Sequence, residues 1–207
     1  ADGYISRIRV TNGSGYVLDV CYHNGYSTIN RHLSAFLSPI AERVKKLQYE
    51  NENWEVEIIP EPDEYPVKAG QRIALSGNTG YSFGPHLHLD VFETETGDYI
   101  DPMPFFKKNL KDTRAPKADG IMLFPQLGKG VVSGSQENKT ILPNSEHPVE
   151  AWGVIGTGIK AYDYMDGVNN HYGVYSVVLT VDGTEVFRST VDRFSQEELI
   201  PEIHYGC

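Results

Sequence analysis

The chain has 207 residues, which allows one large domain or two small ones. Acidic residues number 28 against 18 Lys and Arg, and the formal net charge of −10 argues against binding to nucleic acid or to an anionic membrane, since both need a cationic surface. Two cysteines, Cys21 and Cys207, rule out a disulfide-rich scaffold, and no apolar run approaches the roughly 20 residues of a membrane span. Twenty Gly, 12 Pro and 13 Tyr favour a mainly β chain of short strands and turns.

The first third of the chain is predicted to consist of strands and tight turns. Residues 4–10 alternate from the outset, and residues 17–22 form a buried-strand candidate between the turn signals at residues 12–15 and 24–25. A domain rarely begins with a core strand and no lead-in. We therefore expect either that processing has removed a preceding segment or that the chain is a fragment of a longer one.

A helix is predicted over residues 38–50. Ser38 is a suitable N-cap residue, and Pro39 fits the first helical position. One face of this helix is apolar and carries Ile40, Val44 and Leu47.

Acidic residues dominate the segment that follows. Residues 50–64 contain seven acids and no Lys or Arg. The alternation of Trp54, Val56 and Ile58 with glutamates predicts an edge strand with a charged outer face. The run indicates a solvated surface, and a cation site is the alternative interpretation.

Residues 67–92 hold the most informative pattern. A strand over 71–76 leads into a Gly-rich loop over 77–85, and a second strand covers 86–92. His86 and His88 lie two residues apart and therefore project from the same face of that strand. The alternating side chains then point into the core, namely Leu87, Leu89 and Val91.

Beyond a polar linker at residues 112–116, the pattern stays β. Strands are predicted over 120–124, 149–153 and 158–164, and residues 174–187 form a hairpin with Asp182 and Gly183 at its turn. Short strands at this spacing suggest a sandwich. The predicted domains are residues 1–112 and 113–207.

Histidine is the residue type that carries candidate chemistry. Of two imidazoles side by side on a strand, one can hold a metal while the other contacts the attacking water, although the spacing also fits two exposed histidines. His32 by itself fits a surface or capping role. The chain has no phosphate-binding loop and no His-Glu-x-x-His, and Cys21 fits a buried, inert thiol.

Four blocks in order resemble the M23, or lysostaphin-like, zinc metallopeptidases. The main block runs from Leu75 to His88, and the resemblance extends over residues 1 to about 106. The other blocks are residues 24–34, 67–74 and 97–102.

The resemblance implies an antiparallel β-sheet domain whose groove holds Zn²⁺ and cuts peptide cross-links of bacterial peptidoglycan. It implies His88 as a zinc ligand, His86 as the catalytic histidine that acts on the attacking water, and His32 as the catalytic histidine that stabilises the reacting centre. Three protein ligands leave zinc one open position, and neighbouring imidazoles can move protons or stabilise an oxyanion. The family also implies a location in the bacterial cell envelope, periplasmic or extracellular.

Two departures from the family pattern carry expectations of their own. The family takes a further His and Asp ligand from a segment before the first strand of this chain, so we expect a truncated peptidase domain that is inactive alone. The connection between His32 and Gly70 is longer than usual. We interpret residues 35–66 as an insertion of a helix and an acidic strand that walls the groove.

The second half resembles an immunoglobulin-like sandwich in general pattern, notably at residues 159–163 and 181–183. We expect it to be an accessory module that lacks its last strands. Two other functions stay open. One is a degenerate relative that binds the cell wall or regulates other wall hydrolases, and the other is an adhesion module centred on the sandwich.

Overall fold

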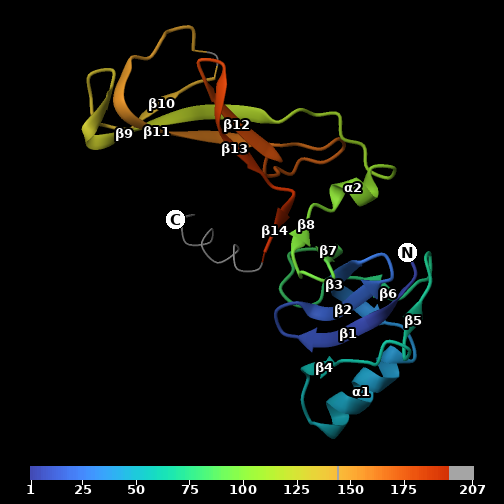
Figure 1. Cartoon of the computed structure of the whole chain (residues 1–207). Helices are drawn as coiled ribbons and strands as arrows, with labels where there is room; N and C mark the ends of the chain where they lie inside the picture. The colour runs from blue at the N-terminus through green and yellow to red at the C-terminus, as the bar shows by residue number, and fades with distance from the viewer. Residues whose placement is uncertain (144, 196–207) are drawn as a thin grey trace. The chain divides into compact units, whose positions relative to one another are not determined.

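The computed structural model describes residues 1–143 and 145–195, and it is mainly antiparallel β as predicted. The chain forms two compact units (Figure 1). The first comprises Ala1–Pro102 together with the described residues from Asp192 on, and the second comprises Met103–Val191. No helix in the described ranges is long and apolar enough to cross a membrane.

The first unit is built on one nine-stranded antiparallel sheet in the order β14-β8-β7-β3-β2-β1-β4, with β5 pairing to β1 and β6 pairing to β3. Its strands are β1 (Gly3–Thr11), β2 (Gly15–Tyr22), β3 (Tyr26–Phe36), β4 (Val56–Ile58), β5 (Pro66–Val67), β6 (Ala74–Ser76), β7 (His88–Glu93), β8 (Tyr99–Ile100) and β14 (Arg193–Phe194). The predicted edge strand is confirmed, because β4 ends the sheet with Val56 and Ile58 buried and Glu57 exposed.

One face of this sheet forms the hydrophobic core. Ile8 and Val10 of β1 stand opposite Ile58 and Val56 of β4. The same cluster contains Leu18 and Val20 of β2. Helix α1 (Ile40–Glu50) contributes Ile40 and Val44. Helix α1 therefore covers the apolar face.

The segment from Ser38 to Ile58 differs in two ways from its prediction. The N-cap residue is Pro39, and the Ser38 hydroxyl donates to Glu42 Oε1 at 2.6 Å instead of capping a backbone N–H. The expected groove wall is also absent. His88 pairs with Arg31 across β7 and β3 and lies on the face opposite the core, whereas α1 closes the core face.

The strands around the Gly-rich loop are shorter than predicted. Strand β6 begins at Ala74, and β7 begins at His88. His86 precedes β7 and forms an isolated bridge with Gly77. Val91 is buried as predicted, but Leu87 is 48% exposed, so its predicted core position is wrong. Leu87 lies before the continuous ladder, where no second layer covers it.

The second unit holds two separate antiparallel sheets. Its elements are α2 (Met103–Phe106), β9 (Lys117–Val132), β10 (Lys139–Ile141), β11 (Ala151–Tyr162), β12 (Ser176–Val181) and β13 (Thr184–Thr190). The larger sheet has the order β10-β9-β11, and β12 pairs with β13. The predicted hairpin is confirmed, with Asp182 and Gly183 both at positive φ in its turn.

Two strands predicted at residues 149–153 and 158–164 are one continuous strand, β11. Its register against β9 shifts between Gly153 and Ile155, which marks a bulge. Gly153 has φ +78°, and a Cβ there would lie 2.0 Å from the Lys129 carbonyl oxygen. Gly153 therefore accommodates a bulge inside one strand.

The division into compact units falls earlier in the chain than the boundary expected after residue 112, and the chain returns to the first unit at Asp192. The described strands of the second unit number five, in sheets of three and two. Its immunoglobulin-like character and its role as a separate domain stay predictions. Cys21 is a free thiol of intermediate exposure and not fully buried, and Cys207 lies outside the described residues.

Candidate metal centre and active site

Three histidines from two separate segments of the chain converge on one face of the first unit. Each of His32, His86 and His88 offers one ring nitrogen, and these three atoms all lie within 4.8 Å of one another. The His32 ring centroid lies 4.9 Å from that of His86 and 5.6 Å from that of His88. The structure thus brings together the three histidines that the sequence singled out.

His32 sits where β3 changes partner. Strand β3 pairs with β7 as far as Arg31 and with β6 from Leu33 on. His32 between them has φ 59°, a left-handed conformation in which histidine is more common than most residues. Such irregularities re-aim a side chain. His32 is buried, with 6% of its surface exposed, and its Nδ1 lies 2.9 Å from the Thr79 carbonyl oxygen.

The Gly-rich loop is fastened to the turn between β1 and β2. Thr79 Oγ1 donates to the Leu33 carbonyl oxygen at 2.6 Å and accepts from the Tyr16 N–H at 3.0 Å. Gly15 and Gly80 both have positive φ, and a Cβ on Gly80 would lie 2.3 Å from the Gly15 nitrogen. Glycine at both positions lets the two backbones touch, and this contact positions the carbonyl that binds His32.

His86 is held by the end of the same loop. Its backbone N–H donates to the Gly77 carbonyl oxygen at 3.0 Å, and its Nδ1 lies 2.8 Å from the Gly84 carbonyl oxygen. Ser82 Oγ approaches the same Nδ1 at 3.2 Å. A carbonyl oxygen can only accept, so Nδ1 of His86 carries the proton and Nε2 is left with a lone pair.

His88 has a carboxylate partner. Its Nε2 lies 3.2 Å from Asp90 Oδ1, and Arg31 Nη2 lies 2.8 Å from Asp90 Oδ2. Both contacts lie on the sheet face that carries the histidine cluster, because Arg31 stands opposite His88 in the ladder. Sequence reasoning missed Asp90 and Arg31. The i, i+2 spacing of His88 and Asp90 could have indicated the first, whereas the second needs the strand register.

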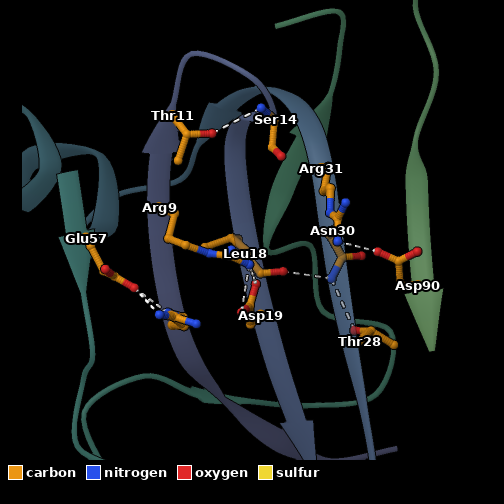
Figure 2. A network of polar contacts seen from close by, with 11 residues as sticks. Arg9, Thr11, Ser14, Leu18, Asp19, Thr28, Asn30, Arg31, Glu57 and Asp90 are labelled. Atoms are coloured by element: carbon orange, nitrogen blue, oxygen red, sulfur yellow. Dashed lines mark hydrogen bonds and ion pairs between the residues drawn. The ribbon is translucent and has the colours of Figure 1, made fainter. Parts of the chain in front are cut away.

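Charged side chains continue across this face over β4, β1, β2, β3 and β7 (Figure 2). Arg9 donates to both carboxylate oxygens of Asp19, at 2.7 and 2.9 Å. Burial raises the pKa of the Asp19 carboxyl above its ordinary value of 3.8, and the hydrogen bond from Arg9 offsets part of that rise. Glu57 pairs with Arg7 on the same face. The sheet therefore has one apolar and one charged face.

The other described histidines, His23, His147 and His171, are not part of this cluster. His23 follows β2, where its ring contacts Tyr4, and His171 packs against Tyr162 and Tyr164 in the second unit. His204 lies outside the described residues. Within the described ranges, His32, His86 and His88 form the group of three or more His, Cys, Asp or Glu side chains arranged to share a metal ion.

The chemistry of these donors fits a late divalent metal. Imidazole nitrogen suits Zn²⁺, Cu²⁺, Fe²⁺ and Ni²⁺. Each of the three rings has one nitrogen occupied by an oxygen acceptor, which leaves the other with its lone pair free. The cluster can thus hold a metal, exchange protons, or do both.

Comparisons with known proteins agree with this chemistry over part of the chain. An uncharacterized metalloprotease of Haemophilus influenzae is 33% identical over 91 residues, which cover 44% of this chain. Lysostaphin of Staphylococcus staphylolyticus and glycyl-glycine endopeptidase ALE-1 of Staphylococcus capitis are each 53% identical over 45 residues, or 20% of this chain. No protein-family profile matches the chain, and no solved structure does so significantly.

The matched segments are short relative to the known proteins, covering 14%, 9% and 12% of the lengths of these three relatives. Their names describe metalloproteases and a glycyl-glycine endopeptidase. At this partial coverage, the relatives support a metal-dependent peptidase.

Proposed function

We propose that this chain is the catalytic part of a zinc-dependent endopeptidase that hydrolyses peptide cross-links of bacterial peptidoglycan. The observation that carries the proposal is the convergence of His32, His86 and His88, with three ring nitrogens within 4.8 Å. The partial likeness to lysostaphin and to a glycyl-glycine endopeptidase favours wall peptides as the substrate and the cell envelope as the location.

The three histidines take different roles in this proposal. Zinc supplies a Lewis acid that lowers the pKa of water and polarises the scissile carbonyl. His88 holds the metal. His86 presents the lone pair of Nε2, because Gly84 occupies its Nδ1–H, and it takes the proton from the attacking water and returns it to the leaving amine.

His32 stabilises the developing oxyanion in the proposed reaction. Its Nδ1–H is committed to the Thr79 carbonyl oxygen, so donation from Nε2 requires the doubly protonated ring. Burial at 6% exposure and the fastened loop keep this ring in one orientation. Preorganisation of this kind lowers the cost of reorganising the site during the reaction.

Two aromatic side chains on the Gly-rich loop support recognition of an extended substrate. Tyr81 is 85% exposed and Phe83 is fully exposed, although Tyr81 N–H donates to the Gly13 carbonyl oxygen at 2.6 Å and holds the loop backbone. Exposed aromatic rings on a held loop beside a catalytic cluster can bind a peptide with a small loss of conformational entropy.

The second unit is proposed as an immunoglobulin-like accessory module that positions the peptidase on its substrate. We also expect the 207-residue chain to bind zinc weakly and to hydrolyse wall peptides slowly by itself. The described cluster consists of three histidines, of which the proposal assigns one as a ligand, and structural and catalytic zinc sites need three or four.

The proposal is tested by zinc content and by peptide release from purified peptidoglycan, measured on the 207-residue chain and on the complete gene product. We expect one zinc ion per molecule in the complete product, with peptide release abolished in His86→Ala while zinc is retained. His88→Ala should lose both. His171→Ala is the matched control, because this histidine lies outside the cluster, and it should change neither.

A second candidate is a non-catalytic relative that binds the wall or regulates other hydrolases. It is favoured by the absence of a carboxylate from the described three-histidine group. If the complete product holds no zinc and releases no peptides, the peptidase proposal fails. Retention of that metal-free protein on purified wall material would then establish the second candidate.

A further inference from the structure

We propose that Asp90, held by Arg31, is a positioning residue that keeps the proton of His88 on Nε2 and leaves Nδ1 as its metal-binding atom. The inference rests on the proposed function, in which His88 holds the metal. It adds a residue pair and a defined tautomer to that site.

The strand register places the three side chains together. His88 and Asp90 are two residues apart on β7 and share a face, and Arg31 of β3 stands directly opposite His88. Asp90 Oδ1 lies 3.2 Å from His88 Nε2, and Arg31 Nη2 lies 2.8 Å from Asp90 Oδ2 (Figure 2 shows the second contact).

The Asp90 carboxylate is confined by its surroundings. Its side chain is 18% exposed, and its Oδ2 is buried and makes no hydrogen bond, so the Arg31 guanidinium supplies the charge that balances it. A carboxylate in this position costs free energy unless it is paired. Asp90 thus contacts Arg31 through Oδ2 and presents Oδ1 as the hydrogen-bond acceptor toward His88.

The tautomer of His88 follows from this acceptor. A neutral imidazole has one N–H, and the nitrogen that faces a carboxylate is the one that carries it. His32 and His86 carry the proton on the other ring nitrogen, because in each of them Nδ1 faces a backbone carbonyl oxygen. The cluster therefore contains one Nε2–H ring and two Nδ1–H rings, and His88 is the ring with a carboxylate partner.

This difference has a chemical consequence for metal binding. A carboxylate on the remote nitrogen of a ligating histidine fixes the ring and raises the basicity of the ligating nitrogen. Loss of such a partner typically lowers metal affinity by about 10- to 100-fold. Asp90 gives His88 a carboxylate partner, whereas the partners of His32 and His86 are backbone carbonyl oxygens.

The test is a long-range ¹H–¹⁵N NMR spectrum of histidine-labelled, metal-free chain at about pH 8, where free imidazole is mostly neutral. We expect the Nε2–H pattern for His88 and the Nδ1–H pattern for His32 and His86. In Asp90→Ala, His88 should become a mixture of tautomers while the other two rings are unchanged. Glu93→Gln is the matched control, since Glu93 is another β7 carboxylate paired with an arginine, Arg193, and it should change no tautomer.

The outcomes separate this inference from the proposed function. An Nδ1–H pattern for His88, or an unchanged His88 in a folded Asp90→Ala, overturns the inference whatever the protein does with zinc. Asp90→Asn provides a second variant of nearly equal volume if the alanine variant does not fold, and its weaker neutral acceptor should give an intermediate mixture. Zinc affinity of the complete gene product, measured by chelator competition, should fall about 10- to 100-fold in Asp90→Ala. If the complete product binds no zinc at all, the proposed function fails while the tautomer result still stands.

Discussion

The two compact units differ in where they place their apolar side chains. In the first unit, one sheet face and α1 enclose a cluster whose members, such as Ile8 and Leu18, have no exposed surface. In the second unit, Val132 is the buried large apolar side chain among the described residues, while Trp152 is 80% and Leu127 81% exposed. Both units are antiparallel β, and in the first unit α1 covers one sheet face as a second layer.

The histidine cluster lies on the unit that has the core. A sheet that is anchored on its apolar face can hold charged and strained groups on the other, as at the left-handed His32 and the buried Asp19. The comparison suggests that a precise catalytic arrangement depends on a packed layer behind it.

Truncation of a core residue should have the largest effect on stability. We expect Leu18→Ala to destabilise the first unit by about 2–5 kcal/mol, because it leaves a cavity in a fully buried cluster. Leu127→Ala in the second unit should change stability by at most about 0.5 kcal/mol. Urea unfolding followed by hydrogen exchange at β2 and β12 measures the two units separately. Equal effects of the two substitutions would show that the contrast in packing is wrong.

The contact between Gly15 and Gly80 should come next. Gly80→Ala places an alanine in the left-handed backbone conformation, which should lower the free energy of unfolding by about 1–2 kcal/mol. The new Cβ also overlaps the Gly15 backbone, which should lower it by about a further 1–3 kcal/mol. Gly167 in the second unit has φ +78° and open space around it, so Gly167→Ala isolates the cost of the backbone conformation. Thermal unfolding and the His32 ring shifts report the result. A cost for Gly80→Ala no larger than that for Gly167→Ala would rule out the tight contact.

The exposed aromatic ring at Phe83 should affect binding rather than folding. Under the proposed function, Phe83→Ala removes a substrate contact worth about 1 kcal/mol and raises KM about fivefold, with stability unchanged. Trp152→Ala is a control of similar exposure in the second unit, and it should leave KM for a short soluble wall peptide unaltered. The two variants are compared by peptide hydrolysis kinetics. An unchanged KM in Phe83→Ala would show that Phe83 does not contact the substrate.

The smallest predicted effect is a pH dependence from Asp19. Burial raises the pKa of this carboxyl in the folded state, so the folded state binds its proton more tightly than the unfolded state does. The contribution of Asp19 to stability should therefore be greatest below the ordinary pKa of 3.8 and fall as the pH rises through the raised pKa. Unfolding free energies of the wild type minus those of Asp19→Asn should decrease over this window and then level off. An increase with pH would mean that Arg9 lowers the pKa more than burial raises it.

Local pattern predicted most strands, the helix and the Asp182–Gly183 hairpin, since each depends on residues close in sequence. Local pattern gave wrong predictions where contacts between distant segments decide the structure. The bulge at Gly153 joins two predicted strands because β9 lies beside it, and the segment predicted to wall the groove instead closes the core. A periodicity shows that a helix face is apolar, but not which sheet face it covers.

The candidate site shows the same division. The sequence by itself determined that His86 and His88 share a face, because residues two apart on extended backbone point the same way. The tertiary structure decided that His32 joins them, that Thr79 fixes its ring, and that Arg31 holds Asp90 beside His88. These contacts depend on strand order, register and a left-handed residue at a change of pairing partner. Such features arise only when distant segments compete for the same hydrogen-bonding edge, and no local pattern in the chain encodes them.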